Sequence, residues 1–324
     1  MSSSDILDRT IARIEARLPG RVRRATPSGE LTTYRVGGPF AAVVRVGDDE
    51  ALDALAGIVG TVDVPVLVVG RGSNLLVADA GFEGIAVVLD DDFERVDIDV
   101  ATASVRAGGS TSLPVLARRA AAAGVSGLEF YVGIPGSVGG AVRMNAGGHG
   151  RETQEVLIDV DLLDLRTGTR TTRATHDLDF AYRHSNLHDH DVVCAARFTG
   201  SREAAEACAA RIDAIVKWRR EHQPGGANAG SVFSNPPGAS AGALIDATGL
   251  KGLRIGGAVV SEKHANFIVA DPTATATDVH ALLAEVRSRV ADATGVVLQT
   301  EMRLVGFDAI DRTNPPTPDP QVRR

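Results

Sequence analysis

Residues 127–150 read G-L-E-F-Y-V-G-I-P-G-S-V-G-G-A-V-R-M-N-A-G-G-H-G and hold eight glycines in 24 residues. Glycine loses more backbone freedom on folding than other residues, so such a stretch is kept where the backbone turns tightly or approaches a ligand. Successive N–H groups in a glycine-rich loop form a concave anion site. Ser137 and Asn145 can add hydrogen bonds to a phosphate or a ring edge. The alternative, a plain surface loop, fits less well because Val, Ile and Phe are frequent here.

The composition limits the classes of function. The chain has 324 residues, a net charge of −7 and two cysteines. The length suits two domains, and the negative charge disfavours nucleic acid as a partner, because phosphates need a basic face. Cys194 and Cys208 are interpreted as buried hydrophobes, since they form neither a metal pair nor a disulfide framework. We expect no metal and no obligate protein partner.

The N-terminus and the hydropathy pattern bear on location. The first residues, M-S-S-S-D-I-L-D-R-T, lack the basic and apolar parts of a signal peptide. No apolar run reaches the length of a membrane span. The sequence therefore predicts a cytoplasmic protein with no membrane partner.

Apolar periodicity predicts the main helices and strands. An N-terminal helix has Ser4 as its cap. A helix over 202–222 ends before a linker, and a helix over 277–293 ends at Gly295. A final strand over 296–304 carries Glu301. The inward residues expected of the first two long helices are Ile6, Leu7, Ile11, Ile14 and Leu18, then Ala205, Cys208, Ile212, Ile215 and Trp218. Those of the last are Val279, Leu282, Leu283, Val286 and Val290.

A second glycine-rich segment, G-R-G-S-N at 70–74, follows a buried strand at 65–69. Its position after a strand favours phosphate binding. A Rossmann fingerprint would need a third glycine where Leu75 stands and a helix after it. The chain continues as strand and turn instead, and it has no Gly-Lys pair before Ser or Thr. The Rossmann and Walker loops are therefore both excluded.

Six motifs in one order resemble the UDP-N-acetylenolpyruvoylglucosamine reductase family. They are G-R-G-S-N-L-L-V-A-D, G-I-P-G-S-V-G-G-A-V-R-M-N-A-G, A-Y-R-H-S, G-S-V-F-S-N-P, V-S-E-K-H-A-N-F-I-V and T-E-M-R-L-V-G. The resemblance implies an α+β fold. It places an FAD-binding region of the vanillyl-alcohol-oxidase type over 1–205 and a smaller α+β substrate-binding domain over 206–307. A disordered tail is expected over 308–324.

The resemblance also implies an activity in peptidoglycan precursor synthesis. The family reduces UDP-N-acetylenolpyruvoylglucosamine to UDP-N-acetylmuramate with non-covalent FAD and with NADPH as co-substrate. Hydride passes from NADPH to the flavin and then to C3 of the enolpyruvyl group. Negative charge develops on C2 and the carboxylate, so the step needs a cation at the carboxylate and a proton donor near C2.

The motifs assign residues to these roles. Arg183 fits the carboxylate because its guanidinium is a planar fork. Ser231 matches the family's proton donor and Glu301 its acid partner, while Arg303 faces the same way on a strand and assists. The other expected substrate contacts are Tyr182, His222 and Asn235. The expected FAD contacts are Gly70, Arg71, Gly72, Ser73, Asn74, Leu75, Ile134, Pro135, Gly136, Ser137, Gly139, Gly140, Asn145 and Gly147. Taken singly, such an Arg, Ser or Glu is more often a solvated charge, a turn or a water-facing group.

The chain also departs from the family pattern. His222 stands where the family commonly has a lysine that binds the nucleotide part of the substrate, and Ala270 replaces a usual asparagine. No inserted loop with a substrate-binding tyrosine follows Arg183, as in the family's second type. His149 and His184 are interpreted as structural or exposed, and His264 as a residue that orders the backbone.

Two other functions stay open at the level of the sequence. One is an oxygen-using oxidase of a sugar or hydroxy acid on the same flavin fold. The other is a non-catalytic protein that binds a nucleotide or UDP-sugar. Reduction of the flavin by NADPH would separate the first from a reductase, and a colourless protein would favour the second.

Overall fold

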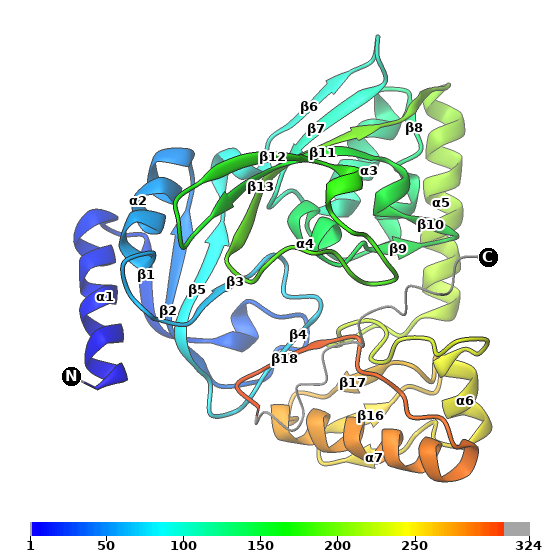
Figure 1. Cartoon of the computed structure of the whole chain (residues 1–324). Coiled ribbons are helices and arrows are strands. Elements are labelled where there is room, and N and C mark those ends of the chain that lie inside the picture. The colour runs from blue at the N-terminus through cyan, green and yellow to red at the C-terminus, as the bar shows by residue number, and fades with distance from the viewer. Residues whose placement is uncertain (1, 308–324) are drawn as a thin grey trace. The chain divides into compact units, whose positions relative to one another are not determined.

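A computed structural model describes residues 2–307 of the chain. The backbone clusters into two compact units whose segments alternate along the sequence (Figure 1). Within the described residues, unit 1 comprises 2–26, 40–71 and 83–219, and unit 2 comprises 27–39, 72–82 and 220–307. The predicted division at residue 205 differs from these bounds and stays a prediction. The tail predicted over 308–324 lies outside the described residues.

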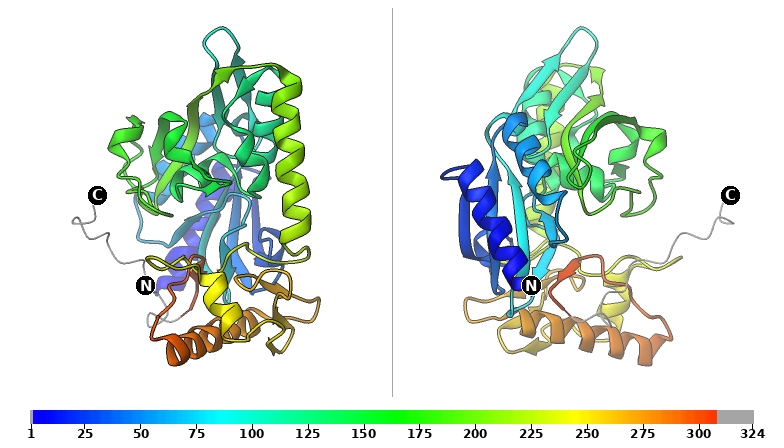
Figure 2. Two further views of the ribbon diagram at one scale, coloured as in Figure 1. Left: turned by 90° about the vertical axis from the view of Figure 1, so that its right-hand side faces the viewer. Right: turned by 60° about the vertical axis from the view of Figure 1, so that its left-hand side comes forward.

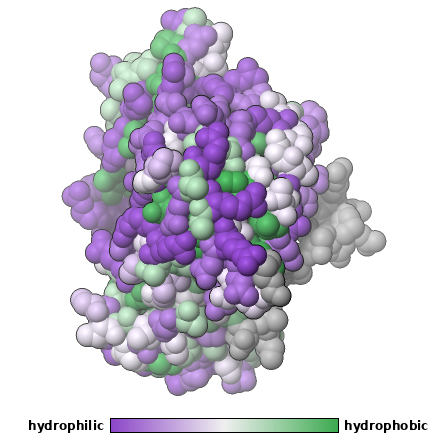
Figure 3. All heavy atoms as spheres, turned by 90° about the vertical axis from the view of Figure 1, so that its left-hand side faces the viewer, coloured by the Kyte–Doolittle hydropathy of each residue, from purple (hydrophilic) through white to green (hydrophobic). Residues whose placement is uncertain are grey.

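The first part of unit 1 is a four-stranded sheet with two helices. Its strand order is β1-β2-β5-β3, for β1 (Val22–Pro27), β2 (Pro39–Val46), β5 (Phe82–Leu89) and β3 (Val66–Val68). Helices α1 (Ser3–Arg17) and α2 (Asp49–Val59) share a core with it, in which Ile11 and Ile14 meet Leu52 and Leu55. The outer side of this part is polar, and Figure 3 shows mostly hydrophilic residues on that face.

The predicted cap of α1 is wrong by two residues. Ser2, not Ser4, is the N-cap, because its Oγ accepts the Asp5 N–H at 3.2 Å and the Asp5 carboxylate accepts the Ser2 N–H at 2.9 Å. This reciprocal pair satisfies two backbone N–H donors at once, which a cap at Ser4 would not, because Leu7 three residues later has no acceptor.

The second part of unit 1 is a five-stranded antiparallel sheet. Its order is β12-β11-β13-β7-β6, for β12 (Arg170–Ala174), β11 (Leu157–Asp164), β13 (Asp191–Thr199), β7 (Ser104–Gly108) and β6 (Val96–Asp99). Alternate residues of a strand point to opposite faces. Val160 therefore packs in the core with α3 (Leu113–Ala122), α4 (Val138–Arg143) and α5 (Ala205–His222), whereas Leu163 packs in the core with α1 and α2. Figure 2 shows these layers from two sides.

Helix α5 begins later than predicted, although it ends at His222 as expected. Arg202 is not helical but belongs to β14 (Ser201–Arg202), which pairs with β8 (Val125–Ser126). Cys208 and Ile212 are buried as predicted. Trp218 was expected to point inward, yet 42% of its surface is exposed. The expectation is wrong because the buried residues of α5 lie in its first half.

Unit 2 contains a three-stranded antiparallel sheet and a parallel pair. The sheet is β15 (Arg254–Ile255), β16 (Ala258–Val260) and β17 (Ile268–Ala270), and the pair is β4 (Leu75–Val77) with β18 (Arg303–Val305). Helices α6 (Ala241–Ala247) and α7 (Ala276–Thr294) complete its core. All five predicted inward residues of α7 are buried, and α7 ends at Gly295, whose φ of 74° is left-handed.

The remaining described elements are short. The two-residue strands β9 (Gly147–Gly148) and β10 (Arg151–Glu152) pair with each other. Five 3₁₀ helices complete the set: η1 (Ser28–Glu30), η2 (Asp91–Glu94), η3 (Glu129–Gly133), η4 (Thr153–Glu155) and η5 (Thr175–Asp177). Between residues 2 and 307, each helix is too short or too polar to cross a bilayer. Cys194 and Cys208 are both buried and unbridged, as predicted.

Candidate functional site

In unit 1 the glycine-rich loop lies along the segment that joins β7 to α3. Leu113 N–H donates to Gly136 O at 3.0 Å, Val138 N–H to Thr111 O at 2.9 Å, and Gly139 N–H to Gly109 O at 2.8 Å. Two short backbone segments, 109–113 and 136–139, are thus fixed against each other, and the loop is an ordered part of unit 1. The alternative of an irregular surface loop is not supported by this pairing.

The two predicted glycine loops meet at Ser137. A Cβ on Gly70 would lie 2.3 Å from Ser137 Oγ, which shows that glycine is required for this close approach. Ser137 Oγ also accepts the Gly140 N–H at 3.3 Å as the N-cap of α4. Gly139 is constrained too, because its Cβ would lie 3.2 Å from Gly109 O. Gly70, Ser137, Gly139 and Gly140 are therefore brought together, as the motifs predict.

Buried hydroxyl groups next to both loops have no protein partner. Five buried side-chain oxygens lack a hydrogen bond among the described residues: Ser110 Oγ and Thr111 Oγ1 in unit 1, and Thr32 Oγ1, Thr33 Oγ1 and Tyr34 Oη in unit 2. An unsatisfied buried polar group costs about 1–3 kcal/mol. Such groups are typically retained for a ligand or water that completes them.

Two of the residues that carry these hydroxyl groups bond to the glycine loops through their backbones. Thr111 O accepts the Val138 N–H of the first loop, and Thr33 N–H donates to Gly72 O of the second at 3.2 Å. Burial also raises the pKa of Tyr34, so its hydroxyl is a neutral donor. Within each unit, polar donors beside a glycine loop fit a nucleotide cofactor. Sequence reasoning missed these residues, although G-G-S-T at 108–111 repeats the combination of glycine and hydroxyl.

Asn145 is used by the protein itself. It is fully buried with a φ of 41°, and its Nδ2 donates to Glu152 Oε2 at 2.9 Å and to Ala181 O at 3.0 Å. Its Oδ1 accepts the Gln154 N–H at 3.0 Å. Both amide hydrogens are thus engaged, so the side chain positions Ala181, two residues before Arg183. Its contact with a cofactor stays a prediction.

Arg183 lies in a tight turn with its predicted neighbours. Ala181 and His184 exchange two backbone hydrogen bonds, of 3.2 and 3.1 Å. The guanidinium carbon of Arg183 lies 4.8 Å from the centre of the Tyr182 ring, and its Nη2 donates to Gly147 O at 3.4 Å. The φ of Arg183 is 55°, a strained value of the kind that concentrates at functional sites. Tyr182, Arg183 and Gly147 therefore form one cluster in unit 1.

Of the other predicted cofactor residues in unit 1, Pro135 is exposed, and Arg71 lies 4.0 Å from the Glu94 carboxylate. Ile134 is partly buried and packs against the core under α3 and α5. The contacts of these three with a cofactor stay predictions.

In unit 2, Ser231 and Glu301 lie on adjacent antiparallel segments. Glu301 N–H donates to Val232 O at 2.9 Å, and Phe233 and Thr300 form an isolated bridge. Ser231 directly precedes the residue that accepts this bond. The strand predicted over 296–304 is wrong in extent, since β18 begins at Arg303. Glu301 and Arg303 therefore do not share a strand face, and the pairing across segments bonds Glu301 to Val232, the residue after Ser231.

The second glycine loop, at 70–74, is bonded to the segment that carries Glu301. Asn74 Nδ2 donates to Glu301 O at 3.2 Å, and Arg303 N–H donates to Asn74 O at 2.9 Å. Gly72 is required here because a Cβ would lie 1.9 Å from Leu31 O. Ser73 is partly buried and Leu75 is buried at the start of β4. Residues 72–75 thus connect the predicted cofactor loop to the predicted acid within unit 2.

Asn266 holds the segment that carries Ser231, a role that the sequence did not reveal. Its Oδ1 accepts the Phe233 N–H at 3.0 Å, its Nδ2 donates to Phe233 O at 2.8 Å, and its carbonyl accepts the Val232 N–H at 3.0 Å. His264 Nδ1 accepts the Asn266 N–H at 3.2 Å, which confirms that His264 orders the backbone. Burial lowers the pKa of His264, which favours the neutral acceptor form.

The last two predicted substrate residues lie elsewhere in unit 2. Asn235 is exposed, and its Oδ1 accepts the Ala241 N–H at 3.0 Å at the start of α6. His222 is exposed at the end of α5. Their substrate contacts stay predictions. Ala270, where the family usually has asparagine, is buried, and nothing in the structure explains the replacement.

Comparisons with known proteins agree with this arrangement. Residues 40–173 match a family model described as an FAD binding domain, and residues 222–305 match the C-terminal domain of UDP-N-acetylenolpyruvoylglucosamine reductase. The chain therefore contains an FAD-binding domain. The match of both domains confirms the predicted α+β fold with a flavin domain and a C-terminal domain.

Individual relatives extend over most of the chain. The UDP-N-acetylenolpyruvoylglucosamine reductase of Sphingopyxis alaskensis is 42% identical over 89% of this chain and 95% of its own length. That of Heliobacterium modesticaldum is 44% identical over 89% of this chain and 91% of its own. A crystal structure of the enzyme from Thermus caldophilus has a TM-score of 0.77 and 36% identity, and it covers 88% of this chain and 99% of its own.

Proposed function

The chain belongs to the UDP-N-acetylenolpyruvoylglucosamine reductase family, and we propose that it reduces UDP-N-acetylenolpyruvoylglucosamine to UDP-N-acetylmuramate with NADPH. The family resemblance drawn from the six motifs is thereby confirmed. The observation that carries the proposal is the pairing of the Ser231 segment with the Glu301 segment, with Asn74 bonded to Glu301.

The residues of this chain fit FAD. When bound, FAD supplies the transfer of hydride from NADPH to the substrate. We propose that Gly70, Ser137, Gly139 and Gly140 let the backbone approach its pyrophosphate. The hydroxyl groups without partners, in particular Ser110 and Thr111, offer hydrogen bonds to the same ligand.

Arg183 is proposed to hold the enolpyruvyl carboxylate. A planar guanidinium can donate two parallel hydrogen bonds to a carboxylate. The Tyr182 ring and Gly147 O constrain the side chain, so less rotamer freedom is lost when substrate binds. Neutralising the carboxylate also stabilises the negative charge that develops beside C2.

Ser231 is proposed to donate the proton that C2 receives. Ser231 is a partly buried residue on a segment that Asn266 holds by three hydrogen bonds. Glu301 is fixed through its backbone to Val232 and Asn74, which supports its role as the acid partner of Ser231. The UDP-sugar is proposed to contact Tyr182, His222, Asn235 and Arg303, with His222 in place of the usual lysine.

A test separates the two halves of the reaction. Ser231→Ala should keep its FAD and should be reduced by NADPH at a near-normal rate under anaerobic conditions, because no substrate carbanion exists in that step. Reoxidation of the reduced flavin by UDP-N-acetylenolpyruvoylglucosamine should slow about 10²–10⁴-fold, the usual contribution of general acid catalysis. Stopped-flow absorbance of the flavin measures both rates.

Ser234→Ala is the matched control, since Ser234 lies on the same segment and pairs with Gln299 through its backbone. It should leave both rates near normal. If both half-reactions of Ser231→Ala fell together, Ser231 would be holding the flavin or the fold. If oxygen, and not the enolpyruvyl substrate, reoxidised the wild-type flavin, the chain would be an oxidase and the proposal would be wrong.

A further inference from the structure

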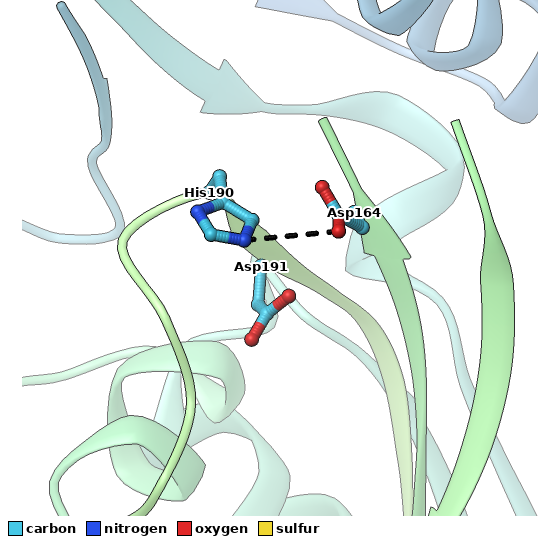
Figure 4. Close-up of side chains that lie close together, drawn as sticks. All are labelled: Asp164, His190 and Asp191. Carbon is cyan, nitrogen blue, oxygen red and sulfur yellow. Dashed lines mark ion pairs between the residues drawn. The ribbon is translucent and has the colours of Figure 1, made fainter. Parts of the chain in front are cut away.

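Three potential metal ligands meet in unit 1, at the end of β11 and the start of β13. Asp164 ends β11 and Asp191 begins β13, and the two are direct partners in the antiparallel register. His190 precedes Asp191, and its carbonyl accepts the Leu165 N–H at 2.9 Å. Figure 4 shows His190 and Asp164 facing each other, with Asp191 beside them. The backbone of two paired strands therefore fixes the positions of all three.

Each carboxylate is oriented by the backbone through one oxygen. Asp164 Oδ1 accepts the N–H groups of Arg166 at 2.7 Å and of Thr167 at 3.3 Å, and Asp191 Oδ2 accepts the His188 N–H at 2.7 Å. Asp164 Oδ2 lies 3.7 Å from His190 Nε2. One donor atom from each of the three residues lies within 4.8 Å of the others. The second oxygen of Asp164 is thus directed at the imidazole.

The local charge favours a cation. Two carboxylates directly opposite each other on paired strands repel. Two nearby arginines pair with other carboxylates: Arg143 bonds Asp189 at 2.6 Å, and Arg170 bonds Asp53 at 2.8 Å. Among residues 2–307, the ion pairs of Asp164 involve His190 alone.

The donor set selects the class of ion. Zn²⁺ binds imidazole and carboxylate at about 2.0–2.2 Å, so neighbouring donors of a tetrahedral site lie about 3.4 Å apart. The 3.7 Å separation in this cluster is close to that value. Ca²⁺ takes 6–8 oxygen ligands and Mg²⁺ prefers oxygen in an octahedron, whereas imidazole suits Zn²⁺ and similar ions. We propose that Asp164, His190 and Asp191 bind one divalent transition-metal ion of the Zn²⁺ type.

Such an ion would link the end of β11 to the start of β13. It would fix residue 190, where the segment that carries Arg183 returns to the sheet. A fourth position would be open to water, because the chain provides three ligands. The expected effect is a higher unfolding temperature, since an ion that binds the folded chain stabilises it by mass action.

The test uses the full chain, free of affinity tags and stripped with a chelator. Isothermal titration with ZnCl₂ and native mass spectrometry should give one ion per chain, and Zn²⁺ should raise the unfolding temperature. His190→Asn should weaken binding about 100-fold or more, because losing a ligand costs at least as much as losing a residue that orients one. Asp164→Asn should do the same while it keeps an oxygen for Arg166 and Thr167. Circular dichroism should show both variants folded.

His176→Asn is the matched control. His176 Nε2 lies 3.5 Å from Asp177 Oδ1, so it forms an exposed His–Asp pair without the opposed second carboxylate. This variant should bind Zn²⁺ as tightly as the wild type. The proposal is overturned if the wild type binds no Zn²⁺ at micromolar concentrations, or if His190→Asn and His176→Asn bind equally.

Discussion

At the scale of the residue, Gly140 is a position where the protein leaves room for a side chain. A Cβ there would lie 3.4 Å from Ser137 Oγ, an ordinary contact, and the residue is exposed. Gly139 differs, because its Cβ would crowd a backbone oxygen at 3.2 Å. A change at Gly140 therefore probes what lies against the loop, while a change at Gly139 also disturbs the fold.

We predict that Gly140→Val folds but loses most of its flavin. If the FAD pyrophosphate lies against this loop, the added side chain should cost about 1–3 kcal/mol, which weakens binding about 5- to 150-fold. Flavin absorbance per chain and circular dichroism measure the two effects. Gly57→Val in α2, where nothing lies within 4 Å of a Cβ, should stay yellow. Full occupancy in Gly140→Val would show that the loop does not contact the cofactor.

Single residues were predicted unevenly from the sequence. Ser231 and Glu301 were singled out because their types and motifs match a known chemistry; the structure pairs their segments, and their catalytic roles stay predictions. Asn266 could not, because its role depends on Phe233, 33 residues away, to which it offers both a donor and an acceptor. The bonds of the Asn145 amide to Glu152 and Ala181 could not be read from the sequence either, and its contact with a cofactor stays a prediction.

At the scale of the element, an ion pair connects η3 to α5. Arg211 donates from Nη2 to Glu129 Oε1 at 2.7 Å and to Glu203 Oε2 at 2.6 Å. Glu129 is buried and Glu203 is partly exposed. Burial would raise the pKa of Glu129, but hydrogen bonds from Arg211 and from the Gly127 N–H outweigh it and lower that pKa. Because η3 leads into residues 134–147, this pair holds the start of the glycine-rich loop.

We predict that Arg211→Met lowers the free energy of unfolding by about 2 kcal/mol, because the buried Glu129 carboxylate loses its partner. Glu203→Gln keeps the buried pair and should cost much less. A group whose pKa is lowered on folding stabilises the chain above its unfolded pKa, here 4.5, and loses that contribution as the pH falls further. Urea titrations at several pH values should therefore show the deficit of Arg211→Met shrinking below about pH 4.5. A deficit that did not change with pH would refute the carboxylate as its cause.

Elements with strong periodicity were predicted well, and those decided by distant partners were not. The pattern of α7 identified its buried face and its end at Gly295, because both follow from local sequence. The last strand was predicted too long, since residues 299–301 pair with 232–234 and only 303–305 pair with β4. Apolar alternation alone cannot distinguish these two partners.

At the scale of the whole molecule, the grouping of segments was beyond sequence reasoning. Asn74 bonds Glu301 across 227 residues, and Asp79 bonds Thr277 across 198. These contacts place residues 72–82 with the C-terminal part of the chain in unit 2. Local patterns describe a strand, but they do not say which unit contains it. The predicted order of one flavin domain followed by one substrate domain lacks this exchange of segments.

The mode of flavin attachment also belongs to this scale, because it depends on which nucleophiles the whole fold leaves available. Covalent attachment to flavin in related folds uses cysteine or histidine side chains. Cys194 and Cys208 are buried in separate cores. Burial raises the pKa of the Cys194 thiol to about 12, so the reactive thiolate is scarce at neutral pH.

We therefore predict that FAD is bound without a covalent bond. Acid precipitation of the purified chain should release all the yellow colour, because unfolding removes every contact that holds a non-covalent ligand. Absorbance of the supernatant, compared with that of the protein before precipitation, gives the released fraction. Flavin-free protein mixed with FAD after precipitation corrects for trapped ligand. Colour that stayed in the pellet would contradict the prediction, and mass spectrometry of its peptides would then identify the attached residue, with the exposed His149 examined first.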